Sequence, residues 1–337
     1  MHLGILTSGG DCAGLNAVIR GAVRRAIVQY GDKVTGFLEG WRGVLEGRSI
    51  DLTIDGTRGL LHYGGTILKS SRVNPLREER GSERVRQALA GKKIDALLVA
   101  GGDGSARLSY ALSGEGIPIL HLPKTIDNDI PLTDHCFGFD TALTVVVEAL
   151  DRLSTTAESH DRIIVCEVMG NESGSLAFYG GLAGGADYIF IPEAPADLEG
   201  ACEVIRLRHR RGRDFSIVVV AEGTKFPSGV KDFPPPPYGP GHAAPAVAEF
   251  LQKRMGYETR YVVLGHVQRG GTPTAFDRVL ATRAGTAAVD AAHEGLTGKM
   301  LAFQGSQIVP VDLKDVAQAP RRILQGAQYD GIKVFFG

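Results

Sequence analysis

Two aspartates in the segment LPKTIDND, Asp127 and Asp129, stand two residues apart beside a lysine and a threonine. In an extended segment, residues i and i+2 point to the same face, so both carboxylates can share one site. Two neighbouring carboxylates repel each other unless a cation or a proton joins them. One of them can hold Mg²⁺ while the other accepts a proton from a hydroxyl group. The alternative is an Asx-turn that caps the next element, because Asp-Asn-Asp is also common turn chemistry.

Two glycine-rich turns are the next candidates. Residues 8–14 (SGGDCAG) and 101–105 (GGDGS) each follow a predicted strand and precede a predicted helix. In open α/β sheets, ligands bind beyond the carboxyl ends of the strands. A glycine-rich turn at that place can direct its backbone N–H groups toward an anion. Neither turn is a standard nucleotide motif. In the first turn, Asp11 replaces the second glycine of the dinucleotide pattern, and Leu15-Asn16 follows where a P-loop has Lys-Ser/Thr. Tight strand-to-helix packing is the alternative for each turn. The presence of two turns favours phosphate binding.

The elements that must position these residues alternate between short apolar runs and helical periods, which predicts an α/β fold with largely parallel sheets. We expect strands at 4–7, 34–38, 96–100, 117–120, 162–168, 187–191, 215–221 and 260–264, and helices at 15–28, 83–90, 141–154 and 275–292. The proline- and glycine-rich residues 227–245 predict a surface excursion with little regular structure. A soft division of the chain falls near residues 138–160.

Composition limits the possible functions. The chain has 337 residues, 37 basic and 38 acidic, so its net charge of −1 argues against nucleic acid or an anionic membrane as a partner. Four widely spaced cysteines suggest neither a disulfide framework nor a zinc site. No apolar run approaches the ~20 residues that span a bilayer. We therefore expect a cytoplasmic protein.

The chain resembles the 6-phosphofructokinases over about residues 3–310. The motifs TSGGDCAGLNAVIR, GGTILKSSR, GGDGS, PKTIDND, EVMG, AEG and LGHVQRGG occur in the order typical of that family. The resemblance implies two doubly wound, Rossmann-like lobes, each with three αβα layers. Residues 1–138 plus a C-terminal return segment would form the phosphoryl-donor lobe, and residues 139–310 the sugar-phosphate lobe. It also implies phosphoryl transfer to the 1-hydroxyl of fructose 6-phosphate in glycolysis, with Mg²⁺ and either ATP or pyrophosphate as donor.

The resemblance assigns a role to each matching residue. Asp127 matches the general base, and the other positions matching the catalytic group are Lys124, Thr125, Arg72 and Asn171. Asp103 and Asp129 match the groups that hold Mg²⁺. The positions matching the donor site are Gly10, Arg72, Gly102, Asp103, Gly104 and Ser105.

The acceptor positions lie mostly in the second half of the chain. The residues that match contacts to the sugar phosphate are Thr125, Asp127, Arg162, Met169, Gly170, Glu222, Arg260, His266 and Arg269. Without the resemblance, His266 would be taken for a structural histidine and Arg162 or Arg260 for a solvated charge. In the family, the counterparts of Arg162 and Arg260 reach the site from a neighbouring subunit, which implies a homo-oligomer, a tetramer or dimer of dimers.

Two positions bear on the choice of donor and point in opposite directions. Pyrophosphate enzymes typically have aspartate where this chain has Gly104, so the space for an α-phosphate is open here. They also have lysine at Lys124, where bacterial ATP enzymes commonly have glycine. Gly104 decides by exclusion, whereas a lysine attracts the phosphates of either donor, and the family also includes members with glycine plus lysine that use ATP. We therefore expect ATP, with pyrophosphate as the alternative.

The chain departs from the family pattern at Asn171, which replaces an arginine that stabilises charge on the transferring phosphoryl group. Lys69, where the family usually has glycine, and Lys124 could together supply the missing charge. A weakly active or regulatory paralogue is the opposing interpretation. Sedoheptulose 7-phosphate and tagatose 6-phosphate stay open as acceptors. Because Ser154 replaces a usual arginine of the effector site, we do not expect control by ADP or phosphoenolpyruvate.

Overall fold

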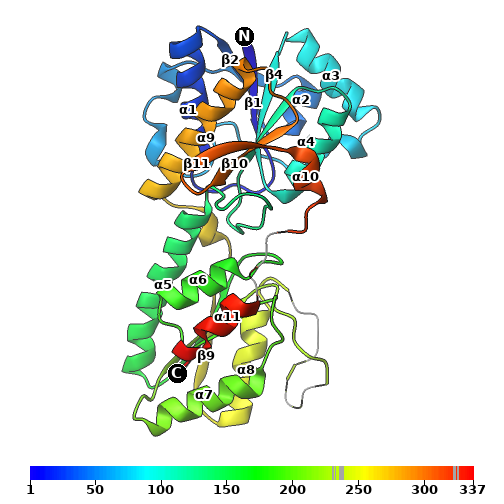
Figure 1. Ribbon diagram of the computed structural model, residues 1–337. Coiled ribbons are helices and arrows are strands. Elements are labelled where there is room, and N and C mark those ends of the chain that lie inside the picture. Colours follow the sequence, from blue (N-terminus) through cyan, green and yellow to red (C-terminus); the bar gives the residue numbers. More distant parts are fainter. Residues whose placement is uncertain (230, 232, 235–238, 322–323, 325) are drawn as a thin grey trace. The chain divides into compact units, whose positions relative to one another are not determined.

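The computed structural model describes residues 1–229, 231, 233–234, 239–321, 324 and 326–337 (Figure 1). The chain forms two compact units. Unit 1 comprises Met1–Thr141 and Arg269–Arg322, and unit 2 comprises Ala142–Gln268 and Ile323–Gly337. Residues 269–310, which the sequence assigned to the second lobe, therefore belong to unit 1. Over the described ranges, no helix combines the length and the apolarity that a membrane span requires.

Unit 1 is built on a seven-stranded sheet in the order β11-β10-β5-β4-β1-β2-β3. Only the β2–β3 and β10–β11 pairs are antiparallel. The central strand β4 reads ALLVAG and is buried throughout, as expected for a parallel strand covered on both faces. The strands are β1 (His2–Thr7), β2 (Lys33–Phe37), β3 (Ser49–Asp51), β4 (Ala96–Gly101), β5 (Ile119–Pro123), β10 (Lys299–Gln304) and β11 (Gln307–Asp312).

Helices cover both faces of this sheet. Figure 1 shows α1 and α9 on one side and α2, α3 and α4 on the other. The pair α1–α9 packs closely because glycines lie at the contact: a β-carbon at Gly21 would stand 2.6 Å from the Thr282 carbonyl oxygen, and one at Gly285 would stand 2.3 Å from that of Val18. The helices are α1 (Leu15–Arg25), α2 (Trp41–Glu46), α3 (Gly81–Gly91), α4 (Asp103–Gly114), α9 (Ala275–His293) and α10 (Leu313–Gln318).

Unit 2 contains a four-stranded, fully parallel sheet in the order β7-β8-β6-β9. Side chains of β7 alternate between its faces: Tyr188 and Phe190 join the core formed with α7 and α8, whereas Ile189 lies against Gly181 of α6. The strands are β6 (Ile163–Val168), β7 (Tyr188–Phe190), β8 (Ser216–Ala221) and β9 (Thr259–Val263). The helices are α5 (Phe139–Ser159), which begins in unit 1, α6 (Ser175–Ala183), α7 (Leu198–Arg210), α8 (Ala243–Met255) and α11 (Gly326–Ile332).

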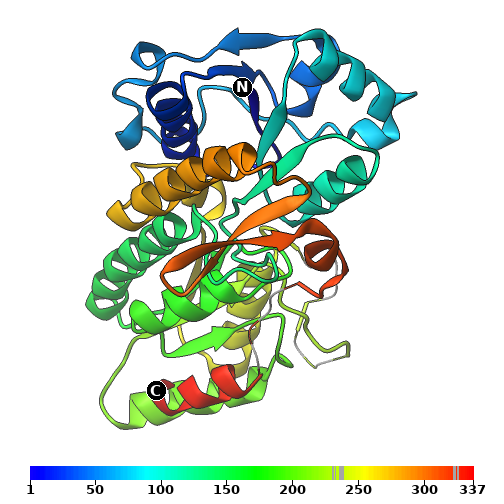
Figure 2. The same ribbon diagram turned by 45° about the horizontal axis from the view of Figure 1, so that its top comes forward.

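The predicted fold class is confirmed, because both sheets are mainly parallel and covered by helices. Two local predictions need correction, and one hairpin was missed. The first helix ends at Arg25 and continues as a π-helix, Ala26–Tyr30. The β10–β11 hairpin was not predicted, and it lies beside β5 in both views (Figures 1 and 2). In the proline-rich stretch, Ala243–Pro245 open helix α8; residues 230, 232 and 235–238 lie outside the described part.

Candidate active site

The two glycine-rich turns lie at the carboxyl ends of the adjacent parallel strands β1 and β4. The Ser8 N–H donates to the Ala100 carbonyl oxygen at 2.9 Å, and the hydroxyl groups of Ser105 and Ser8 lie 3.0 Å apart. These bonds join the two turns in unit 1. Asp103, within the second turn, is the first residue of helix α4 and is buried. The strand order reverses at this point of the sheet, which is where open α/β folds bind ligands.

The LPKTIDND segment continues β5 at the same edge of the sheet. It is not extended as the sequence argument assumed, because Asn128 has a left-handed backbone with φ of 50°. The buried Asn128 side chain accepts a hydrogen bond from the Cys136 N–H at 2.9 Å, which fixes this turn. The Thr125 hydroxyl accepts from the Asp127 N–H at 3.0 Å. Asp127 and Asp129 still interact electrostatically, so the predicted proximity holds although the reason given for it was wrong.

Desolvation raises the pKa values of both Asp127 and Asp129. Desolvation raises the pKa of Asp127, and the nearby Arg269 and the Thr125 hydroxyl act in the opposite direction. Desolvation, reinforced by the charges of Asp127 and Asp103, raises the pKa of Asp129 from 3.8 to about 6. A raised pKa makes a carboxylate a stronger base near neutral pH. The local chemistry therefore suits Asp127 to accept a proton.

Lys124 lies beneath the first glycine turn. It is buried, and its Nζ donates to the Gly10 carbonyl oxygen at 2.5 Å. Burial lowers the pKa of this ammonium group. Arg269 also contacts the turn, donating to the Asp11 carbonyl oxygen at 3.2 Å, and its Nη1 would stand 2.7 Å from a β-carbon at Gly10. Two cationic side chains thus hold the turn, and Gly10 is the residue that permits the approach of Arg269.

A cavity of about 410 Å³ opens beside this turn and takes in the GGTILKSSR segment. Its lining residues are Gly9, Gly10, Asp11, Thr66, Lys69, Ser70, Ser71 and Arg72. Arg72 and Lys69 are exposed there, so the cavity carries positive charge. This combination of backbone amides, hydroxyls and cations suits a phosphate group.

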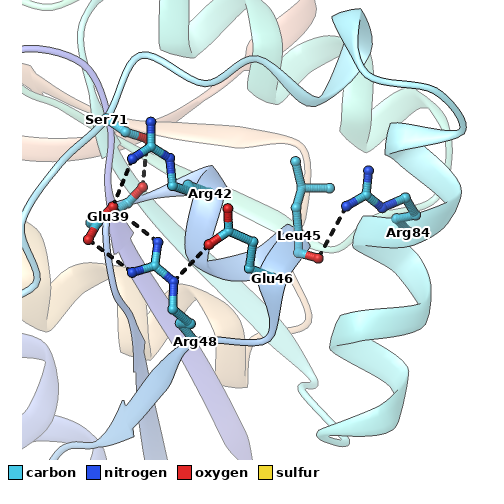
Figure 3. A network of polar contacts seen from close by, with 7 residues as sticks. All are labelled: Glu39, Arg42, Leu45, Glu46, Arg48, Ser71 and Arg84. Carbon is cyan, nitrogen blue, oxygen red and sulfur yellow. Dashed lines mark hydrogen bonds and ion pairs between the residues drawn. The ribbon is translucent and has the colours of Figure 1, made fainter.

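A polar network supports the wall of this cavity. The Ser71 hydroxyl donates to the Glu39 carbonyl oxygen at 2.6 Å. Figure 3 shows the Glu39 carboxylate held by the guanidinium groups of Arg42 and Arg48. Because Glu39 has φ of 56°, these bonds hold an otherwise uncommon backbone conformation. The network thereby fixes the segment that presents Arg72.

The donor set around Asp103 fits Mg²⁺. Its Oδ1 is buried and has no hydrogen-bond partner within the described residues, although Oδ2 is paired. Asp129 is also buried. Within the same ranges, no group of three or more His, Cys, Asp or Glu side chains could hold a metal ion by itself. Mg²⁺ is usually held by one or two carboxylates plus substrate phosphates and water, so Asp103 and Asp129 suffice for it.

Unit 2 brings together the predicted sugar contacts Met169, Gly170 and Glu222. The Glu222 Oε1 accepts hydrogen bonds from the backbone N–H groups of Gly170 at 3.3 Å and Asn171 at 2.8 Å. The Met169 N–H donates to the Gln268 side chain at 3.2 Å. A cavity of about 430 Å³ lies here, lined by Asn171, Glu172, Glu222, Gly223, Thr224, Lys225, Phe226, Gly239 and Pro240. Gly239 and Pro240 of the proline-rich segment therefore form part of its wall.

Arg162 and Arg260 lie together at the β6–β9 edge of unit 2. Both contact the Glu258 carboxylate, Arg162 Nη2 at 2.8 Å and Arg260 Nη2 at 2.5 Å. His266 is exposed in the 3₁₀ turn Gly265–Arg269 that follows β9. Arg162 and Arg260 thus bring two guanidinium groups together at the surface, a chemistry that suits a phosphate. The role of a neighbouring subunit stays a prediction.

Sequence reasoning missed three residues that support the donor site. Arg107 and Arg321 both contact the Asp103 carboxylate. His121 lies fully buried between the Gly101 carbonyl oxygen and the Ser109 hydroxyl, each 3.1 Å away, and desolvation lowers its pKa to about 4. Helical spacing i, i+4 could have indicated Arg107. Nothing in the sequence signals Arg321, which lies beyond the resembling motifs.

The raised pKa of Asp129 predicts how the thermal stability of the protein depends on pH. Because its pKa in the folded chain, about 6, exceeds the ordinary 3.8, its contribution to folding is fully present below pH 3.8 and is lost as the pH rises through about 6. Asp129→Asn removes the buried charge. Without Mg²⁺, we expect its thermal unfolding midpoint at pH 8 to exceed that of the wild type by about 3 °C or more, and the difference to shrink toward pH 4. The exposed Asp151→Asn is the control, and an equal shift at both pH values would contradict the assignment.

The fold defines the class as an α/β protein with two mainly parallel sheets. A model of the phosphofructokinase family matches residues 2–292, and the chain therefore belongs to that family. ATP-dependent 6-phosphofructokinase 3 of Streptomyces coelicolor is 48% identical over 96% of both chains. The pyrophosphate–fructose 6-phosphate 1-phosphotransferase of the same organism is also 48% identical, over 100% of both chains.

Solved structures agree with the family assignment. Pichia pastoris phosphofructokinase in the T-state superposes with a TM-score of 0.84 at 34% identity. The match covers 99% of this chain and 36% of the yeast chain, so this chain spans about a third of that protein's length.

Proposed function

We propose that the protein transfers a phosphoryl group from ATP to the 1-hydroxyl of fructose 6-phosphate, forming fructose 1,6-bisphosphate and ADP. The observation that carries this proposal is the half-buried Asp127, whose pKa is raised by desolvation, beside Thr125, Lys124 and Arg269. Both kinds of relative act on fructose 6-phosphate by name. We also propose a cytoplasmic homo-oligomer, as the resemblance implies.

In this mechanism Asp127 accepts the proton of the sugar 1-hydroxyl as that oxygen attacks the terminal phosphorus of the donor. The Thr125 hydroxyl and the Gly10 backbone contribute hydrogen bonds to the transferring group, while Lys124 and Arg269 hold the glycine turn through its carbonyl oxygens. Arg72 supplies positive charge from the cavity wall. Phosphoryl transfer asks little covalent chemistry of a protein, so positioning and charge stabilisation provide most of the acceleration.

Mg²⁺, held by Asp103 and Asp129, would neutralise charge on the donor phosphates. Gly102 and Ser105 shape the turn that presents Asp103 at the start of α4. In unit 2, Glu222 holds the Met169–Asn171 turn that would contact the sugar. Arg162 and Arg260 would provide the charges for the 6-phosphate, and His266 would contact it as well. Guanidinium groups suit that task because they stay charged and bind oxygens in pairs.

Gly104 favours ATP as the donor. A β-carbon added there would meet no heavy atom within 4 Å among the described residues, so the space next to Asp103 is open. An ATP molecule needs room for its α-phosphate and nucleoside, whereas pyrophosphate does not. Pyrophosphate is the second candidate, because Lys124 matches the pyrophosphate enzymes and a pyrophosphate-dependent relative is as similar as an ATP-dependent one.

The substitution Asn171→Arg tests whether other cations replace the missing guanidinium. Asn171 has φ of 55°, a conformation that Lys69 and Arg80 also adopt in this chain, so an arginine can be accommodated. If Lys69 and Lys124 compensate fully, kcat should change by less than about tenfold. A larger increase would show that compensation is incomplete, and activity gained from an inactive wild type would support the non-catalytic interpretation. Asn171→Gln, which adds length without charge, is the matched control.

The product identifies the reaction. We expect ³¹P NMR of an incubation with fructose 6-phosphate, Mg²⁺ and ATP to show a new phosphate ester at carbon 1. Sedoheptulose 7-phosphate and tagatose 6-phosphate, tested at the same concentration, establish acceptor preference. A product phosphorylated elsewhere, or a clear preference for either other sugar, would contradict the proposal.

A further inference from the structure

The C-terminal return segment of unit 1 is anchored beside the predicted metal site. Helix α10 packs against α4 with Leu313 and Val316 buried. The Arg107 Nη1 donates to the Ala317 carbonyl oxygen at 2.5 Å, which joins the last turn of α10 to the first turns of α4. Arg321, which follows α10, thereby reaches Asp103 just after the end of β4.

One carboxylate oxygen of Asp103 has hydrogen-bond partners and the other has none among the described residues. Its Oδ2 lies 3.1 Å from the Nε of Arg107 and 3.1 Å from the Nε of Arg321. Its Oδ1 is buried without a partner in the part of the chain that the structure describes. A buried oxygen left without a hydrogen-bond partner is unfavourable, so this asymmetry is not a favourable arrangement by itself. It becomes favourable when a cation takes the second oxygen.

The same arginine also approaches the second predicted metal ligand. Arg321 Nε lies 3.9 Å from Asp129 Oδ2, so its guanidinium group lies near both carboxylates. Arg321 and Arg107 together bring two positive charges to a site where Asp103, Asp127 and Asp129 would otherwise repel one another. A guanidinium group can fix the orientation of a carboxylate as well as neutralise its charge, because its N–H groups are fixed in one plane.

We propose that Arg321, with Arg107, is a positioning residue of the metal site: it holds Asp103 through Oδ2 and so leaves Oδ1 directed at the cation. The return segment, through Arg321, thus contributes to the donor site. This inference rests on the proposed function for the identity of the cation and donor. A positioning residue of this kind acts on metal affinity more than on the chemical step at saturating metal.

The test measures cation binding without turnover. Mn²⁺, a paramagnetic substitute for Mg²⁺, is titrated into the full-length protein with excess ADP or pyrophosphate and no sugar phosphate, and free Mn²⁺ is followed by electron paramagnetic resonance. Removing a partner that orients a metal ligand typically costs 10–100-fold in metal affinity, so Arg321→Ala should raise the Mn²⁺ Kd about tenfold or more. Arg321→Lys, which keeps the charge but loses the planar guanidinium group, should fall in between. Arg107→Ala should act in the same direction.

Arg283→Ala is the control for loss of an arginine in unit 1, because Arg283 contacts the Ser306 carbonyl oxygen on the surface. It should leave the Mn²⁺ Kd unchanged. In steady-state assays, Arg321→Ala should raise the half-saturating Mg²⁺ concentration while KM for fructose 6-phosphate stays within about twofold and kcat largely recovers at high Mg²⁺. An unchanged or lower Mn²⁺ Kd would overturn the inference, and a lower one would mean that Arg321 occupies the place of the cation. Failure of the wild type to bind Mn²⁺ with either ligand would overturn the proposed function as well.

Discussion

Asp127→Asn is expected to lower kcat by about 10²- to 10⁴-fold, the contribution of a positioned general base. Asparagine has the same shape but cannot accept the hydroxyl proton, so the acceptor oxygen must attack without proton transfer. Ground-state binding should change little, because Thr125 and Arg269 keep their own contacts to the backbone. Steady-state kinetics, with dissociation constants of ADP and fructose 6-phosphate from calorimetry, separate the two effects.

The control for this prediction is Asp151→Asn, the same chemical change at an exposed position of α5. It should leave kcat and both dissociation constants unaltered. Because the pKa of Asp127 is raised by burial, Asp127→Asn should also unfold at the same temperature as the wild type or higher at neutral pH. A variant that keeps more than a tenth of the wild-type kcat would remove Asp127 from the role of base.

Gly104→Asp should reduce kcat/KM for ATP by about 100-fold, equivalent to about 2.7 kcal/mol. The open space beside Gly104 would then hold a carboxylate next to Asp103, which repels the α-phosphate and crowds the nucleoside. Pyrophosphate, which lacks both groups, should be affected far less. The chain should still fold, because an acidic residue in the first turn of α4 interacts favourably with the helix dipole.

Gly104→Asn separates charge from size in this prediction. It fills nearly the same space as aspartate without the negative charge, so it should cost ATP less than Gly104→Asp if repulsion dominates. Rates with both donors and both variants form one comparison. Equal losses for ATP and pyrophosphate in Gly104→Asp would show that this position does not discriminate between donors.

Sequence reasoning identified the main groups of the candidate site because they occur within short segments at strand ends. Asp127, Asp129 and the two glycine-rich turns could be found in this way, since parallel strands bring their carboxyl ends to one edge. The geometry between neighbours was less accessible. The left-handed Asn128 depends on its bond to Cys136, and the burial of Lys124 depends on a glycine turn more than a hundred residues away.

The remaining misses have the same physical cause. The β10–β11 hairpin lies where no short motif signals it, and its place in the sheet is decided by pairing with β5. Arg321 reaches Asp103 across 218 residues of chain, and no periodicity reports such a contact. His121 sits in a buried apolar strand, where its partners Gly101 and Ser109 come from other elements. Long-range contacts of this kind require the folded structure.

The central claim is that the chain phosphorylates fructose 6-phosphate from ATP, with Gly104 permitting the nucleotide. Initial rates with fructose 6-phosphate and Mg²⁺, comparing ATP with pyrophosphate at equal concentration, test it most directly. We expect turnover with ATP and little or none with pyrophosphate. Turnover with pyrophosphate alone would mean that Lys124, and not Gly104, determines the choice of donor. No turnover with either donor would contradict the catalytic account and would implicate Asn171, which replaces the usual arginine, in the loss of activity.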